Sequence, residues 1–284
     1  MKRSVVEAIE KRSMDAVFPD KDVFRTISVD DVIALSDSFS VKQREIEIFA
    51  LENSIIPNRY ARNVKSFSCK DQAKLLKSKV SIAGLGGLGG AVVEMLARSG
   101  IGCLNLIDGD KFDETNLNRQ LISCEDLIGI SKAQAAKKRI AKINSSVEIF
   151  AHPEFLDRTN AKNLLEGSDV VIDCLDNIET RFVIEKNSRE LGIPFVSAAI
   201  AGFSGHVMTV FPQDDGICTI YGHAEDAPQK GAEDSTGNLS ATVMLIAACE
   251  CAEVYKVLLN KGRTLRKKFL AVDLIDNTFE IVRL

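Results

Sequence analysis

Six residues in the first half of the chain, 84–89, read Gly-Leu-Gly-Gly-Leu-Gly, which is the composition of a phosphate-binding loop. They follow a short apolar run at 80–83 and precede an amphipathic stretch at 88–99, a pattern that predicts a strand, a tight turn and a helix. Glycines let the backbone approach a phosphate closely, and the start of a helix offers unpaired N–H groups. The spacing fits a dinucleotide as well as it fits ATP. The candidate contacts are Gly84, Gly86, Gly87 and Gly89.

An acidic residue, Asp108, closes the next predicted strand at 103–107 and follows Gly89 by 19 residues. In nucleotide-binding α/β sheets, a carboxylate at this place accepts hydrogen bonds from the ribose hydroxyls. We therefore expect Asp108 to lie beside the glycine loop and to bind the ribose.

Two basic residues come next. Arg119 lies in the segment 116–120, and Lys132 lies in a helical stretch at 127–143. Two cations near a bound nucleotide suit a pyrophosphate leaving group better than hydride transfer, because hydride transfer moves no phosphate. Taken singly, Arg119 would also fit a surface cation and Lys132 a solvated helix end.

The sequence Asp-Cys-Leu-Asp-Asn at 173–177 ends a very apolar strand predicted at 170–174. Ligands of doubly wound sheets bind outside the carboxyl ends of the strands, so Asp176 is expected to face the same crevice as the glycine loop. A carboxylate there could hold Mg²⁺ against phosphate oxygens. It could equally cap the helix that follows.

Apolar strands alternate with helices between residues 80 and 199, which indicates a parallel sheet covered on both faces. The last third predicts strands at 206–211 and near 217–221, a polar loop at 222–238, a long helix at 239–259 and a hairpin of 270–275 with 279–284. The expected fold is α/β: a doubly wound, mainly parallel, Rossmann-like sheet with a C-terminal antiparallel extension.

Residues 1–57 differ from the rest of the chain. Apolar residues recur at helical spacing, for example within 41–53, but their faces are too few to bury a core alone. We expect a small N-terminal helical appendage at 1–57, or a dimerisation arm, and one domain at 58–284.

Composition narrows the functional classes. The 284 residues carry a net charge of −4, which gives no basis for capture of nucleic acid or anionic lipid. The most apolar stretch, 239–259, contains Glu250, Glu253 and Lys256, so no membrane span is expected. Seven cysteines scattered through apolar runs are typical of reduced thiols in a cytoplasmic protein.

Taken together in their order and spacing, these motifs resemble the ThiF/MoeB/HesA group of ubiquitin-activating-like adenylyltransferases. The resemblance spans residues 59–283, about four fifths of the chain. It adds the segment Arg-Tyr-Ala-Arg-Asn at 59–63 and Asp-Gly-Asp at 108–110 to the motifs above. Residues 1–57 lie outside it.

The resemblance implies a reaction. Such enzymes bind Mg·ATP, and the C-terminal carboxylate of a small ubiquitin-like sulfur-carrier protein, usually ending in Gly-Gly, attacks the α-phosphorus. An acyl-adenylate forms and pyrophosphate leaves, in the biosynthesis of sulfur-containing cofactors such as thiamine or molybdopterin.

It also implies a role for each matched residue. Arg119 and Lys132 would contact the phosphates and stabilise the transition state, Asp176 would bind Mg²⁺, and Asp108 the ribose. Asn116 and Gln120 would contact the nucleotide. Arg62 matches an arginine that enters the ATP site of the other subunit, which implies a homodimer.

The cysteines depart from the family pattern. Many members hold a structural zinc with two Cys-x-x-Cys pairs, whereas here Cys218 is followed by Tyr221 at the second position. We expect no structural zinc. The loop at 222–238 has no cysteine, and Cys218, between Ile217 and Ile220, is expected to be an inert strand residue. The simpler interpretation is therefore that adenylation proceeds without a covalent enzyme intermediate.

Three other functions are considered. The first 57 residues could clamp a short ribosomal peptide whose C-terminus is adenylated instead of a carrier. The glycine loop alone would also suit a nicotinamide-dependent oxidoreductase, although no hydride-shuttling acid or base is evident. A catalytically inactive scaffold is disfavoured by the intact set of Arg119, Lys132 and Asp176.

Overall fold

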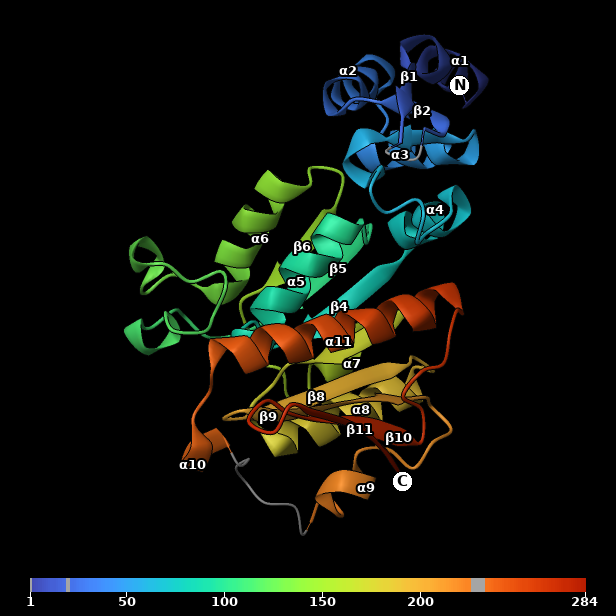
Figure 1. Ribbon diagram of the computed structural model, residues 1–284. Coiled ribbons are helices and arrows are strands. Elements are labelled where there is room, and N and C mark those ends of the chain that lie inside the picture. Colours follow the sequence, from blue (N-terminus) through green and yellow to red (C-terminus); the bar gives the residue numbers. More distant parts are fainter. Residues whose placement is uncertain (1, 19–20, 226–232) are drawn as a thin grey trace.

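The computed structural model describes residues 2–18, 21–225 and 233–284 (Figure 1). Its centre is a sheet of eight strands in the order β11-β10-β9-β8-β7-β4-β5-β6. The five strands from β8 to β6 run parallel. Their bounds are β4 Lys79–Ala83, β5 Cys103–Ile107, β6 Glu148–His152, β7 Val170–Asp173 and β8 Phe195–Ala201.

Helices cover both faces of this sheet, as the continuous apolar strands require. One cluster of buried side chains joins α5, α6 and α11 to the sheet, and a second joins α7 and α8 to the other face. The helices are α5 Gly87–Ser99, α6 Lys132–Ile143, α7 Ala161–Leu165, α8 Ile178–Glu190 and α11 Ser240–Leu259. The predicted doubly wound α/β fold is confirmed.

The strand order reverses beside β4. From β4 the chain proceeds to β5 and β6 on one side, then returns to place β7 and β8 on the other. At such a reversal the loops leaving two neighbouring strands diverge, which opens a crevice at the carboxyl ends. Here the diverging loops are those after β4 and β7.

An antiparallel extension completes the sheet, and the predicted long helix and hairpin are both confirmed. Strand β9 (Ser204–Val210) returns beside β8, and β10 (Lys268–Asp273) and β11 (Thr278–Arg283) form the C-terminal hairpin. Among the described helices, none combines the length and the apolar run that a bilayer crossing needs.

The strand expected near 217–221 is wrong: Cys218–Tyr221 forms a short helix, α9. Strand β9 is already paired on both sides, by β8 and β10, so this segment has no place beside it. Positive φ angles at Gly216 and Gly222 bound the segment, and only Ile217 is fully buried. Local apolar composition could not reveal that the neighbouring positions were taken.

The polar loop expected at 222–238 is described only in part, because residues 226–232 lie outside the described ranges. Beyond them a helical turn, α10 (Glu233–Thr236), precedes α11.

The N-terminal segment contains three strands as well as helices. Helices α1 (Lys2–Arg12), α2 (Val29–Phe39) and α3 (Gln43–Glu52) pack with a sheet in the order β1-β2-β3. The strands are β1 Met14–Val17, β2 Val23–Ile27 and β3 Ile55–Pro57. This unit, which we call the N-terminal module, has a buried apolar cluster of its own, whereas the sequence indicated helices without a core. The pairing of β2 with β3, far apart in the chain, creates that core.

A buried polar network fixes the N-terminal module to the rest of the chain. It involves the 3-10 turn Asn58–Tyr60 and lies next to α4 (Cys69–Lys77). The hydroxyl of Tyr60 donates to Glu47 Oε2 (3.2 Å) and accepts from Asn144 Nδ2 (2.9 Å) at the end of α6. Arg44 donates to the carbonyl of Gly102, just before β5 (2.8 Å). The module therefore sits at the amino ends of the strands (Figure 1), whereas the strand order opens the crevice at their carboxyl ends.

Replacing Tyr60 by Phe should lower the free energy of unfolding by about 1–3 kcal/mol, because two buried polar groups lose a partner. Urea denaturation followed by circular dichroism measures this loss. Tyr255→Phe is the matched control: within the described part of the chain its hydroxyl pairs with Ser99 Oγ alone (2.6 Å), at a half-buried site, so a smaller loss is expected. Equal effects of the two variants would contradict the importance of the network.

Candidate active site

A crevice of about 370 Å³ lies at the carboxyl ends of β4, β5, β6 and β7. Its walls combine the glycine loop, the segment after β5, the start of α6 and the turn after β7. Eight of the residues predicted from the sequence line it: Gly84, Gly86, Gly87, Asp108, Arg119, Gln120, Lys132 and Asp176.

The glycine loop packs directly against the turn that follows β7. Gly84 has a φ of +85°, and a Cβ there would lie 2.6 Å from the carbonyl oxygen of Cys174. A Cβ on Gly89 would lie 1.9 Å from the carbonyl oxygen of Gly84. Gly89 is buried beneath the loop and does not line the crevice. The close approach of the two turns therefore requires glycine at position 84, and the tight path of the glycine loop itself requires glycine at position 89.

Asp108 anchors the glycine loop through a hydrogen bond to its backbone. Its Oδ2 accepts from the backbone N–H of Leu85 (2.6 Å), and its Oδ1 accepts from that of Asp110 (2.7 Å). Burial raises the pKa of Asp108, and these backbone donors and Lys132 oppose that rise. The carboxylate remains at the crevice wall, where a ribose would meet it.

The two candidate cations have different surroundings. Lys132 is the first residue of α6. Its side chain is only 9% exposed and pairs with Asp110 Oδ2 at 3.0 Å, so it is not a solvated helix end. Arg119 is half-buried and donates to the carbonyl of Thr115 and to Asn118 Oδ1, both at 2.9 Å. Both cations line the same crevice.

Gln120 and Asn116 differ in position. Gln120 is buried, and its Oε1 has no hydrogen-bond partner among the described residues, so this acceptor is available to a donor on a ligand. Asn116 does not line the crevice; its Oδ1 accepts from the N–H of Asp113 (3.1 Å) and closes the turn that precedes Arg119. Asn116 thus shapes the wall and does not face the crevice.

Asp176 does not cap α8, because the neighbouring residue Asn177 is the cap. Asn177 Oδ1 accepts from the N–H of Thr180 (2.9 Å) and caps the helix. Asp176 is exposed and lines the crevice.

These residues fit the groups that the sequence implied. The glycine cradle, the orphaned oxygen of Gln120 and the Asp108 carboxylate suit a nucleotide. The single carboxylate of Asp176 suits Mg²⁺, which usually takes one or two protein carboxylates together with phosphates and water. The described residues hold no cluster of three or more metal-binding side chains.

Two lining residues were missed by sequence reasoning. The ring of Phe155 is 68% exposed and lies over Gly109, where a Cβ would come within 2.7 Å of it. Arg181, on α8, is 4% exposed and also reaches the wall. Phe155 follows the β6 strand end, which is the one signal that could have located it. Nothing in the sequence around Arg181 marks it.

A second hollow, of about 420 Å³, adjoins the crevice on the side of β8, β9 and β10. Arg181 and Ile200 line both hollows. Its floor carries small residues, Ala199, Ala201 and Gly205, and its wall includes His206.

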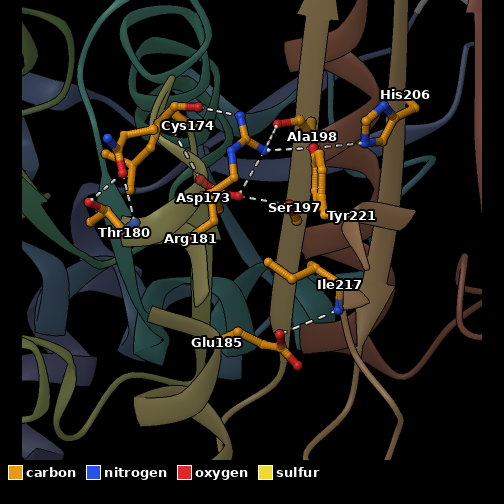
Figure 2. Close-up of polar contacts among 12 residues, drawn as sticks. Asp173, Cys174, Thr180, Arg181, Glu185, Ser197, Ala198, His206, Ile217 and Tyr221 are labelled. Carbon is orange, nitrogen blue, oxygen red and sulfur yellow. Dashed lines mark hydrogen bonds and ion pairs between the residues drawn. The ribbon is translucent and has the colours of Figure 1, made fainter. Parts of the chain in front are cut away.

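The segment with Cys218 is held by hydrogen bonds to neighbouring residues. Cys218, in α9, is half-buried and donates to the carbonyl of Asp215. Tyr221 lies where the family's second cysteine would be. Its hydroxyl lies 3.4 Å from His206 Nε2 and 3.5 Å from Arg181 Nη1 (Figure 2).

Arg62 is exposed and does not line the crevice. It follows Tyr60, which packs against Gly100 at the carboxyl end of α5, whereas the glycine loop lies at the amino end of the same helix. The 13 residues of α5 separate the two by roughly 20 Å. Arg62 therefore cannot reach the crevice of its own chain.

Comparison with known proteins gives a consistent assignment. The family model described as "ThiF family" matches residues 60–284. The SAMP-activating enzyme E1 of Haloferax volcanii is 34% identical over 230 residues, covering 79% of this chain and 84% of that protein. The adenylyltransferase and sulfurtransferase MOCS3 of Mus musculus is 32% identical over 230 residues. That match covers 80% of this chain and 50% of MOCS3, so the chain spans about half the length of the MOCS3 relatives.

Solved structures show the same fold. Escherichia coli MccB, solved with MccA, has a TM-score of 0.70 at 23% identity and covers 90% of this chain and 79% of its own. PaaA has a TM-score of 0.67 at 24% identity and covers 79% of this chain and 82% of its own. MccB has also been solved with ATP.

The pKa of His206 offers a test of the second hollow. Burial and the positive charge of Arg181 disfavour the protonated ring and lower the pKa of His206 to about 4. His206 should therefore stay neutral as the pH falls from 8 to about 5 and become charged only below that. Proton NMR of the histidine C2 signals measures this, with His206→Gln to assign the signal. A midpoint near the ordinary value of about 6.5 would contradict the described surroundings.

Proposed function

This chain belongs to the ThiF family of E1-like adenylyltransferases, and from that premise we propose that it adenylates the C-terminal carboxylate of a small ubiquitin-like sulfur-carrier protein at the expense of ATP. The observation that carries the proposal is the gathering of Arg119, Lys132 and Asp176 around one glycine-lined crevice. That set suits a reaction in which two anionic groups meet.

The chemistry explains why these charges are needed. An oxygen of the carboxylate attacks the α-phosphorus of ATP, the bond from that phosphorus to the bridging oxygen breaks, and pyrophosphate leaves with the electron pair. Both reactants are negative, so attack requires neutralisation of charge before and during transfer. Lys132 and Arg119 supply positive charge at the crevice wall, and Asp110 keeps the Lys132 ammonium in place.

Asp176 would hold Mg²⁺, which when bound neutralises phosphate oxygens. Asp108 would orient the ribose and at the same time fixes the glycine loop through Leu85. Gln120 would accept from a donor on the nucleotide through its unpaired Oε1. The cofactors of the reaction are thus ATP and Mg²⁺, with no structural zinc in the proposal.

The second hollow provides a route for the substrate's tail. It meets the crevice at Arg181 and Ile200, and the small side chains of Ala199 and Ala201 leave room in it. An extended chain ending in small residues, such as Gly-Gly, would fit there with its carboxylate directed to the crevice.

The wider assignment follows the same reasoning. We assign adenylation to residues 58–284, as a cytoplasmic step in the biosynthesis of a sulfur-containing cofactor, and a separate role to residues 1–57. The proposal for this chain includes adenylation and not the sulfurtransferase activity in the name of MOCS3, because the chain spans about half the length of those relatives.

Replacing Arg119 by Met or Asp176 by Asn should lower ATP–pyrophosphate exchange by about 100-fold or more, the usual effect of losing a transition-state contact. Exchange is measured with a Gly-Gly-ended carrier and, separately, with short peptides. Lys137→Met, at an exposed position on α6, is the control and should keep full exchange. Full exchange in both site variants would refute the proposed site.

The position of Arg62 supports a homodimer in which each crevice receives this arginine from the other copy. The separation of roughly 20 Å along α5 excludes a contribution within one chain. The exposed side chain of Arg62 is available to a partner, and closed two-fold dimers exchange equivalent residues in this way.

Mixing two inactive variants tests this arrangement. Arg62→Ala and Asp176→Asn proteins, unfolded together and refolded or co-expressed, should regain exchange activity, because a mixed dimer contains one crevice with both residues intact. Either variant alone should stay inactive. Mixed dimers, isolated by two affinity tags, that lack activity would show that Arg62 does not act across the interface.

A second candidate substrate is the C-terminus of a ribosomal peptide. The observation that favours it is the likeness to MccB, which covers 90% of the chain and so extends into the N-terminal residues beyond the family match. The β1–β2 hairpin there also exposes Met14, Val17 and Val23. Exchange supported by a peptide but by no carrier would select this candidate.

A further inference from the structure

Arg181 is a nearly inaccessible cation beside the crevice. Its guanidinium donates through Nη1 to Asp173 Oδ2 (3.1 Å) and to the carbonyl of Ala198 (2.7 Å), and through Nη2 to the carbonyl of Leu175. Figure 2 shows it reaching from α8 to the end of β7 and across to β8. The Nη1 and Nη2 donors are thus directed at the protein itself, and we infer that the role of Arg181 toward a ligand is indirect.

These contacts immobilise the residue before Asp176. Asp173 Oδ1 accepts from the N–H of Leu175 (3.0 Å), while Arg181 binds the carbonyl of the same residue. Leu175 is thus held at both of its backbone polar groups. On the other side, Asn177 is held by its cap of α8. Asp176 lies between these two anchored residues, and its carboxylate lines the crevice.

The planar shape of the Arg181 guanidinium matters as much as its charge. A guanidinium presents several N–H groups in a fixed plane and can bind a carboxylate and two carbonyls at once, whereas an ammonium is a compact point charge on a flexible stem. Asp173 is fully buried, and Ser197 Oγ also donates to it (2.7 Å). Arg181 and Asp173 together form a rigid base for the turn.

We propose that Arg181 is a positioning residue for adenylation, which holds the turn Leu175–Asn177 so that the Asp176 carboxylate is presented to the cation that accompanies ATP. This inference rests on the proposed function, since it presumes that Asp176 binds that cation. The neighbours of a metal-binding carboxylate commonly set its affinity in this way.

The test uses the full chain, Mn²⁺ as the probe and a non-hydrolysable ATP analogue, so that no turnover is needed. Arg181→Lys keeps a positive charge beside Asp173 but cannot hold both carbonyls. Electron paramagnetic resonance of free Mn²⁺ should show binding weakened by about 10-fold or more, while the analogue's affinity without divalent cation stays unchanged. A purely structural role would lower the melting temperature and leave Mn²⁺ binding by the folded protein unchanged, which would overturn the inference.

Arg189→Lys is the matched control. Arg189 lies on the same helix and likewise pairs with a buried carboxylate, Glu185 (2.7 Å), and a carbonyl, that of Asp215 (3.2 Å), away from the crevice. Mn²⁺ binding should be unaffected in this variant. If Arg181→Lys does not fold, Asp173→Asn replaces it: it keeps the shape but weakens the base of the turn, and retained Mn²⁺ affinity there would overturn the inference.

Asp176→Asn separates the two levels of the proposal. If it leaves Mn²⁺ binding intact, the metal role in the proposed function is wrong and the positioning role falls with it. If it weakens binding while Arg181→Lys does not, the proposed function stands and only the positioning role fails.

Discussion

The active crevice depends on the close contact between two turns, the glycine loop after β4 and the turn after β7. The N–H of Cys174 donates to the carbonyl of Ala83 (2.9 Å), and the carbonyl of Cys174 lies where a side chain on Gly84 would begin. Any larger residue would separate the turns and widen the space in which phosphates and Asp176 have to meet. The contact thus fixes the width of the site.

Buried ionisable side chains lie beside the turn after β7. Asp173 is fully buried, which raises its pKa, and the adjacent Arg181 opposes that rise. Glu250, also fully buried on α11, has its pKa raised well above the ordinary value by burial and by the charge of Asp173. Arg181 Nη1 lies 3.1 Å from Asp173 Oδ2 and forms an ion pair with it next to the turn.

The N-terminal module meets the chain at the opposite edge of the sheet, yet the two edges are joined by α6. Lys132 begins this helix at the crevice, and Asn144 ends it in the network with Tyr60. The same helix therefore borders the crevice at one end and the network that holds the module at the other. Arg62 lies at the same edge as the module, far from the crevice of its own chain.

The sequence by itself determined the parts that depend on short-range pattern. Glycine spacing, the acid after β5, the alternation of strands and helices and the long α11 all follow from local periodicity and turn chemistry. The roles of adjacent residues such as Asp176 and Asn177 stayed open there, and the structure assigned the cap of α8 to Asn177. Only the tertiary structure decided that α9 is a helix, that the N-terminal module forms a sheet, and that Arg181 belongs to the crevice wall. Each of these depends on contacts between segments distant in the chain, and such contacts leave no periodic trace in the sequence.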